Sequence, residues 1–296
     1  ALLVDRHGDL WIGTYLGLDR FDPRTGRFEH YRYAATSPAG EYSNYITSLY
    51  EDRNGNLWAG TQNGVALLHR STKQFSYFLR QDEGGASYLA VFALAQDSAG
   101  AIWAGTVSGL YRLVFSDPAK PGTDQPVVVR RYSEADGLAN QRIFGLLTDA
   151  QNRLWLSTPS GVSEFRNPGH DAHTTPDFKN YDARDGLQTD MFTQGAALKG
   201  RSGRYYFGGL NGFNIFLPDS IRPRDYRPPL VITAFEKFDT DRPDTGAVPE
   251  RGIAVREEVV LSHKNNIFSI EFAALDFHDP NKCRYAYRMR GFNDSW

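Results

Sequence analysis

The chain has 296 residues, enough for one large repeat array or two ordinary domains. Its 33 Lys and Arg balance 35 Asp and Glu, which argues against a nucleic-acid-binding protein, and no Lys/Arg run marks binding to an anionic membrane. The single cysteine, Cys283, excludes an intrachain disulfide, and no apolar run approaches the roughly 20 residues that span a bilayer.

The first residues, "ALLVDRHG", are too short for a signal peptide and have no cleavage pattern. We expect them to end a β-strand, in a chain cut from something longer. The 16 Tyr, 19 Phe and 28 Gly favour short strands and tight turns over long helices.

One pattern then recurs five times along the chain. The copies are centred on an aromatic residue at Trp11, Trp58, Trp103, Trp155 and, in degenerate form, Tyr206, at spacings of 47, 45, 52 and 51 residues. A period of about 40–50 residues with four short strands per unit is typical of β-propeller blades. The predicted fold class is therefore all-β, with about five four-stranded propeller blades.

The second copy shows the strands of one blade. We expect an innermost strand at 45–52, a turn at "DRNGN", and further strands at 57–61, 64–70 and 75–80. The tryptophan is interpreted as a wedge between neighbouring sheets, worth roughly 4–6 kcal/mol when buried. Two of the glycines, Gly60 and Gly105, are expected to let the sheets approach. Others are expected to turn the chain into the third strand: Gly17, Gly64, Gly109, Gly161 and Gly212.

The pattern D-x-x-G-x-L-W-x-G-T-x-x-G-L/V resembles the two-component regulator propeller (Reg_prop) repeat of bacterial sensor proteins. The segment after the fifth copy resembles the start of a Y_Y_Y domain, an immunoglobulin-like module, on Tyr285, Tyr287, Gly291, Phe292 and Trp296. The resemblance implies the periplasmic, non-enzymatic sensing region of a histidine kinase or diguanylate cyclase receptor. It also implies a homodimer through the Y_Y_Y region, no cofactor, and membrane attachment only through a helix absent from this chain.

The predicted domains are propeller blades at 1–221, a proline-rich linker at 222–229 and a partial Y_Y_Y immunoglobulin-like sandwich at 230–296. Family propellers commonly have seven blades, so five blades indicate part of a larger propeller. Blade five also lacks an obvious outer strand. The "HDP" at 278–280 is interpreted as a loop and not as a phospho-acceptor site.

The loops before strand one and between strands two and three share one face of a propeller, where binding residues tend to gather. The candidate ligand-binding residues on this face are Tyr15, Asn44, Tyr45, Gln62, Asn63, Tyr88, Ser108, Gln141, Arg142, Asp190 and Asn211. Rings beside amide and guanidinium groups suit a small molecule or oligosaccharide rich in hydroxyls. The alternative for any single residue is a solvated turn.

Motifs for metals and catalysis are weak. "DRNGN" lacks the Gly and Glu of a calcium loop, and His170 and His173 lack further close ligands, so no metal site is predicted. No nucleophile elbow, P-loop or H-E-x-x-H motif is present.

Two other functions stay open. Propeller lyases of the streptogramin-inactivating type have similar blades but need a His/Glu cluster at the channel mouth, and the candidate loops contain Glu41 without a histidine. A protein-interaction scaffold that uses the propeller rim is the second alternative.

Overall fold

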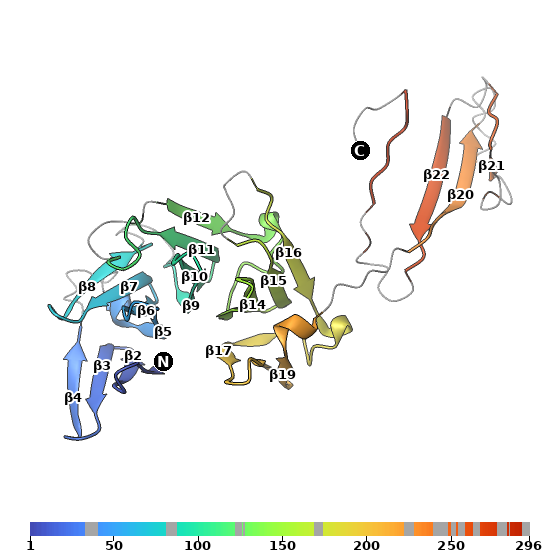
Figure 1. Ribbon diagram of the computed structural model, residues 1–296. Coiled ribbons are helices and arrows are strands. Elements are labelled where there is room, and N and C mark those ends of the chain that lie inside the picture. Colours follow the sequence, from blue (N-terminus) through green and yellow to red (C-terminus); the bar gives the residue numbers. More distant parts are fainter. Residues whose placement is uncertain are drawn as a thin grey trace. The chain divides into compact units, whose positions relative to one another are not determined.

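The computed structural model describes residues 1–32, 41–80, 88–121, 126, 128–168, 174–221, 228–238, 248–249, 253, 258–262, 267–276, 283 and 285–291. The chain divides into two compact units, Ala1–Ile221 and Arg222–Trp296 (Figure 1). Several sequence predictions lie outside the described residues: most of the linker, the two histidines His170 and His173, the segment 278–280, and Phe292 and Trp296 of the tyrosine motif.

The first unit consists of five antiparallel sheets whose strands follow chain order, and Figure 1 shows them fanned around a common centre. Blade one comprises β1 (Leu2–Val4), β2 (Leu10–Thr14), β3 (Gly17–Asp22) and β4 (Arg27–Tyr31). Blade two comprises β5 (Ile46–Glu51), β6 (Leu57–Thr61), β7 (Gly64–His69) and β8 (Gln74–Phe78). Blade three comprises β9 (Val91–Gln96), β10 (Ile102–Thr106), β11 (Gly109–Val114) and β12 (Val128–Tyr132).

Blade four comprises β13 (Gly145–Thr148), β14 (Leu154–Thr158), β15 (Gly161–Phe165) and β16 (Phe178–Tyr181). Blade five has three strands among the described residues, β17 (Phe192–Lys199), β18 (Tyr205–Gly209) and β19 (Gly212–Phe216), so the sequence correctly showed no outer strand there. Four short 3-10 turns complete the unit: η1 (Tyr42–Asn44), η2 (Glu134–Asp136), η3 (Ala183–Asp185) and η4 (Pro218–Ser220). The predicted all-β propeller of five blades is confirmed.

The second unit contains one small sheet in its described part. β20 (Leu230–Phe238) pairs antiparallel with β21 (Val248–Pro249) and β22 (Ile267–Ala274). An immunoglobulin-like sandwich needs a second sheet packed on the first. The Y_Y_Y interpretation therefore stays a prediction.

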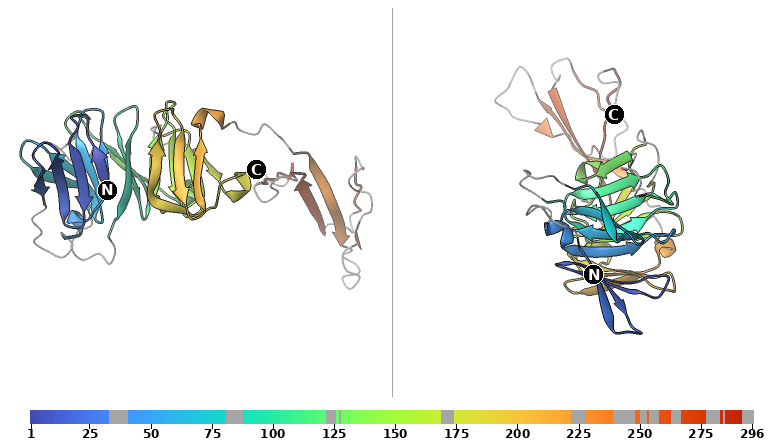
Figure 2. Two further views of the ribbon diagram at one scale, coloured as in Figure 1. Left: turned by 90° about the horizontal axis from the view of Figure 1, so that it is seen from below. Right: turned by 90° about the vertical axis from the view of Figure 1, so that its left-hand side faces the viewer.

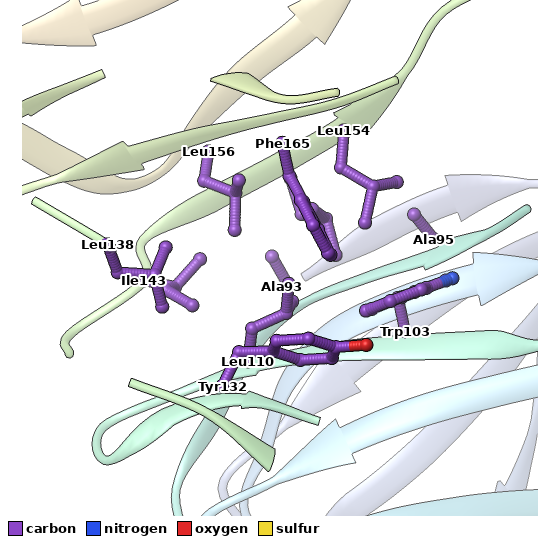
Figure 3. Close-up of a cluster of buried hydrophobic side chains, with 11 residues drawn as sticks. Ala93, Ala95, Trp103, Leu110, Tyr132, Leu138, Ile143, Leu154, Leu156 and Phe165 are labelled. Carbon is purple, nitrogen blue, oxygen red and sulfur yellow. The ribbon is translucent and has the colours of Figure 1, made fainter. Parts of the chain in front are cut away.

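Tryptophan packing joins neighbouring blades. Trp103 is 0% exposed and lies in a buried cluster with Leu154, Leu156 and Phe165 of blade four (Figure 3). Its ring centroid is 5.9 Å from that of Phe165. Since burying a large aromatic is worth roughly 4–6 kcal/mol, this interface is a principal source of stability between the blades.

An aspartate with a buried side chain binds the indole nitrogen of the tryptophan in each of the first four blades. In blade two, Asp52 Oδ2 accepts a hydrogen bond from Trp58 Nε1 at 2.9 Å, and Oδ1 accepts from the backbone N–H of Asn54 and Asn56, each at 2.9 Å. The indole bond recurs in the other tryptophan-bearing blades as Asp5–Trp11, Asp97–Trp103 and Asp149–Trp155, at 2.9–3.0 Å. The sequence predicted a turn at this aspartate but not its bond to the indole; the signal for that bond is the constant spacing of six residues between Asp and Trp.

Glycines allow the close approaches that the sequence predicted. A Cβ at Gly105 would lie 2.6 Å from Ile143 Cγ2 in the next blade. Gly64 has φ +94, and a Cβ there would lie 2.5 Å from the carbonyl oxygen of Phe78 on the outer strand. Alanine would strain either position.

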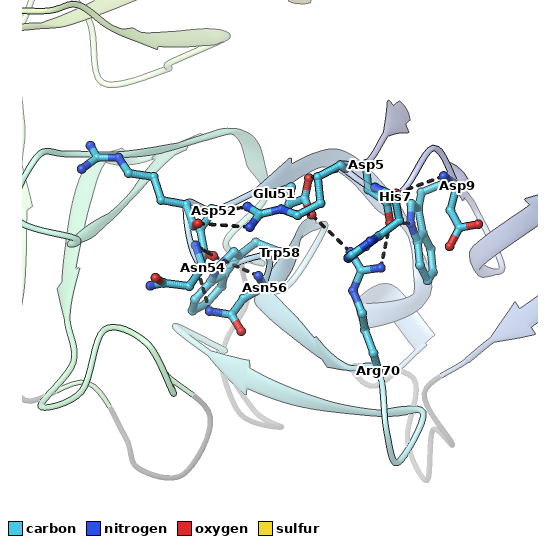
Figure 4. A network of polar contacts seen from close by, with 12 residues as sticks. Asp5, His7, Asp9, Glu51, Asp52, Asn54, Asn56, Trp58 and Arg70 are labelled. Atoms are coloured by element: carbon cyan, nitrogen blue, oxygen red, sulfur yellow. Dashed lines mark hydrogen bonds and ion pairs between the residues drawn. The ribbon is translucent and has the colours of Figure 1, made fainter.

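The turns between first and second strands bind one another from blade to blade (Figure 4). Arg6 of blade one donates to the carbonyl oxygen of Asp52 at 2.6 Å and to the Glu51 carboxylate at 3.0 Å. Arg53 of blade two donates to the carbonyl oxygen of Asp97 in blade three at 2.7 Å. These contacts fix the angle between consecutive sheets.

A charge network joins blade four to the end of blade five. Arg153 contacts Asp149 at 2.7 Å, Glu164 at 3.0 Å and Asp219 at 3.1 Å. The buried Glu164 also accepts a hydrogen bond from the Tyr181 hydroxyl at 2.9 Å. Because Asp219 lies in η4, the network holds the segment that leaves blade five.

We expect Asp52→Ala to lower the free energy of unfolding of the first unit by about 1–3 kcal/mol, because the buried indole N–H of Trp58 loses its acceptor. Chemical denaturation monitored by tryptophan fluorescence measures the change. Asp117→Ala is the matched control, since that exposed aspartate accepts a turn N–H from Ala119 and contacts no indole. Equal effects of the two substitutions would contradict the role of the indole bond.

The contribution of the Asp5 carboxylate to the free energy of unfolding depends on pH. Burial alone would raise the pKa of Asp5, but hydrogen bonds from Trp11, Arg70 and the turn backbone outweigh burial and lower the pKa to about 2. Because this folded-state pKa is below the ordinary value, the stabilisation is present above about pH 4 and is lost as the pH falls toward 2. The difference in unfolding free energy between the wild type and Asp5→Asn should therefore shrink from pH 7 to pH 2.5, and a constant difference would refute this.

Candidate functional site

The two ends of each blade differ in what they present. Strand directions alternate, so the β2–β3-type turns and the segments that lead into each inner strand lie at one end, here called the loop face; the first turns lie at the other end, the turn face. The strands run between these faces in the left view of Figure 2. Hydrogen bonds join the two parts of the loop face: Gln62 N to Tyr45 O at 3.0 Å, and Val107 N to Ala90 O at 2.9 Å.

Four tyrosines form two ring pairs on the loop face of blades one to three. Tyr15 of the blade-one turn contacts Tyr45, which leads into blade two, with ring centroids 4.3 Å apart and planes at 72°. Tyr42 contacts Tyr88, which leads into blade three, with centroids 4.2 Å apart. Tyr15, Tyr42 and Tyr88 are 69%, 42% and 40% exposed. We call these four residues the tyrosine patch.

The sequence found three members of this patch and missed Tyr42. The missed residue lies in η1, next to the predicted Asn44 and Tyr45. Its ring contacts the ring of Tyr88, which is distant in the sequence. Only the fold brings the two together.

The predicted residues of blades four and five form a polar part of the face. The backbone N–H groups of Gln141, Arg142 and Asn211 donate to nearby side-chain oxygens at 2.9–3.1 Å, and the three residues are exposed. Asp190 is also exposed, and its carboxylate accepts from the backbone of Ala183 at 2.6 Å. These residues offer polar groups and no aromatic surface.

The remaining predicted residues are less accessible. Asn44, Gln62 and Ser108 are half-buried. Asn63 is 0% exposed, and its backbone N–H donates to Thr61 Oγ1 at 2.9 Å. The expectation that Asn63 faces a ligand is therefore corrected, because the turn directs it into the protein.

A cavity of about 600 Å³ lies among the inner strands of all five blades. Its lining includes Thr47, Phe92, Phe144 and Lys199, but no residue of the tyrosine patch. The cavity and the patch are therefore separate places for a ligand.

Neither a metal cluster nor a membrane helix is found in the part of the chain that the structure describes. No three His, Cys, Asp or Glu side chains there are arranged to hold a metal ion. No helix in that part is long and apolar enough to cross a bilayer.

The Tyr15–Tyr45 pair has a measurable consequence. The hydrogen bond with Tyr15, aided by burial, raises the pKa of Tyr45 above its ordinary value. We expect Tyr15→Phe to lower the pKa of Tyr45, measured by NMR titration of ¹³C-labelled tyrosine rings. Tyr88→Phe is the control and should leave the pKa of Tyr45 unchanged. If Tyr15→Phe also leaves this pKa unchanged, the Tyr15–Tyr45 pair does not form in solution.

Comparison with known proteins gives one family match and one relative in the curated proteins. The family described as two component regulator propeller matches residues 43–63 and 137–160, which are parts of blades two and four with their lead-in segments. Histidine kinase P4 of Formosa agariphila is 30% identical over 163 residues, which are 54% of this chain and 12% of that protein. The match thus spans about an eighth of the relative's length.

The chain is also similar to solved structures. PorZ, a surface component of the type-IX secretion system of Porphyromonas gingivalis, is 14% identical with a TM-score of 0.52, covering 93% of this chain and 43% of that one. The extracellular domain of a protein named as hybrid two component system BT3049, from B. thetaiotaomicron, is 24% identical with a TM-score of 0.47, covering 95% and 41%. The likeness to PorZ concerns the fold alone.

The family match, the relative and the five described blades support one conclusion. Two stretches of the chain, 43–63 and 137–160, match the two component regulator propeller family, and the chain is similar to a segment of a histidine kinase.

Proposed function

We propose that this chain is the ligand-sensing region of a bacterial signal-transduction receptor and that it acts outside the cytoplasm, in the periplasm, without catalysis. The similarity to a segment of a histidine kinase and the propeller repeats support this proposal. The output domain would be a histidine kinase or a diguanylate cyclase. Sensing requires a ligand that binds two arrangements of the receptor with different affinity.

The tyrosine patch carries the proposal for the ligand, an oligosaccharide or a small molecule rich in hydroxyls. Exposed rings held against each other present flat apolar faces, and Tyr hydroxyls add donors and acceptors. The two pairs cross the boundaries between blades one and two and between blades two and three. The half-buried Gln62 lies beside this patch, since its backbone N–H donates to the carbonyl oxygen of Tyr45.

The signal would leave the propeller through the segment after β19. Arg153 holds Asp219 of η4 at 3.1 Å, so a shift of blade four or five would reach the start of the second unit. We propose that the second unit acts as the Y_Y_Y relay and dimerises in the full receptor. A protein-interaction scaffold is the alternative if no small ligand binds.

Calorimetric titration of the 296-residue chain with a panel of neutral oligosaccharides tests the ligand. For the sugar that binds, Tyr15→Ala and Tyr88→Ala should each weaken the affinity at least tenfold, because each removes a stacking surface. Phe28→Ala is the control, since this ring is 52% exposed on outer strand β4, away from the loop face. Binding that is indifferent to both tyrosines, or heat only with peptides or small acids, would overturn the carbohydrate proposal.

A further inference from the structure

The walls of the central cavity are strand edges. Its lining contains unbroken runs, such as 92–96 and 144–149, although successive side chains of a strand point to opposite sides. The strands β5, β9, β13 and β17 each stand at the end of their sheet order. One edge of each is thus unpaired within its sheet, so backbone N–H and C=O groups line the cavity.

Contacts between inner strands narrow the cavity toward the loop face. The rings of Phe92 and Phe144 lie 5.9 Å apart, and Gly195 N donates to the carbonyl oxygen of Phe144 at 3.1 Å. Thr47 Oγ1 donates to the carbonyl oxygen of Val91. These residues lie at or near the starts of the inner strands or, for Gly195, at a bulge in β17.

The other end of the cavity, here called its mouth, lies at the turn face, and its lining includes two cationic residues. The inner strands run parallel to one another, so their C-terminal ends converge there. Lys199 is the last residue of β17, and Arg53 follows β5 by two residues; both line the cavity and both are exposed. Their hydrogen-bond acceptors are backbone carbonyls, of Thr148 for Lys199 and of Asp97 and Ser98 for Arg53. The Lys199 ammonium also lies 5.8 Å from the centroid of the Tyr205 ring.

The acidic group at this mouth does not offset these charges. Asp149 is 3% exposed at its side chain and is held by Arg153 at 2.7 Å and by the indole of Trp155 at 3.0 Å. Within the described residues, neither Arg53 nor Lys199 makes an ion pair. Two cationic residues therefore line this end of the cavity, and the acidic residue in the described lining, Asp149, is paired with another cation.

We propose that this mouth binds a small organic carboxylate, up to about the size of a hexuronic acid. The ammonium of Lys199 binds the carboxylate by a charge-assisted hydrogen bond, which is about twice as strong as a neutral one, and the positive charge of Arg53 adds to the attraction. The unpaired backbone groups of the inner strands bind the hydroxyls. A cavity of about 600 Å³ is within the ordinary range for small-molecule sites. This site is independent of the tyrosine patch and of the proposed sensing role.

Calorimetric titration with two probes, glucuronate and glucose, tests the proposal, because they differ only in a carboxylate against a hydroxymethyl group. Glucuronate should bind at low salt at least tenfold more tightly than glucose. Lys199→Gln should weaken glucuronate binding at least tenfold, and Lys199→Arg should restore most of it. Lys199 is the better target, since Arg53 also joins blades two and three.

Arg201→Gln is the matched control, because this exposed residue lies in the same turn as Lys199 but does not line the cavity. It should leave the affinity within twofold. Circular dichroism and the unfolding midpoint confirm that each variant is folded. Equal affinity for the two probes, no binding of either, or equal losses in Lys199→Gln and Arg201→Gln would each overturn the proposal.

Discussion

The propeller depends on a hydrogen bond between a buried aspartate and a buried tryptophan in each of its first four blades. A tryptophan wedged between two sheets buries an indole N–H that would otherwise have no acceptor, at a cost of about 1–3 kcal/mol. The carboxylate of the aspartate six residues earlier accepts a hydrogen bond from this N–H and from two backbone N–H groups of its own turn, as Asp52 does for Trp58. One side chain therefore stabilises both the conformation of the turn and the packing of the tryptophan between the sheets.

The Asp–Trp hydrogen bond constrains the sequence at the turn face more than at the loop face. The turn face keeps the aspartate and the tryptophan in each of the first four blades, because the aspartate, the turn and the tryptophan act together. Apart from a threonine and a glycine that close each turn, as Thr61 and Gly64 do, the loop face of these blades is held by backbone contacts such as the hydrogen bond from Gln62 N to Tyr45 O. Its side chains are free to differ between blades, which is how tyrosines come to gather over blades one to three and polar groups over blades four and five.

Some of the candidate site could be predicted from the sequence, since the repeat shows which positions fall in the loops. Tyr15, Tyr45 and Tyr88 were found in this way. Pairing of the rings could not be predicted, because Tyr42 and Tyr88 meet only when two blades pack side by side. The burial of Asn63 was hidden for a similar reason: neighbouring turns look alike in sequence, but the packing of the blade decides which side chain points inward.

The sequence by itself determined the all-β class, the number of blade cores and the wedge role of tryptophan, because a repeated interface demands the same residues at a regular period. It also showed that Gly105 must permit close approach. Only the tertiary structure decided what meets across the blades: the indole acceptor, the tyrosine pairs, the link from Arg153 to Asp219, and the cations at the mouth of the cavity. Such contacts join residues from different repeats, and their geometry depends on the angle between sheets, which no local pattern encodes.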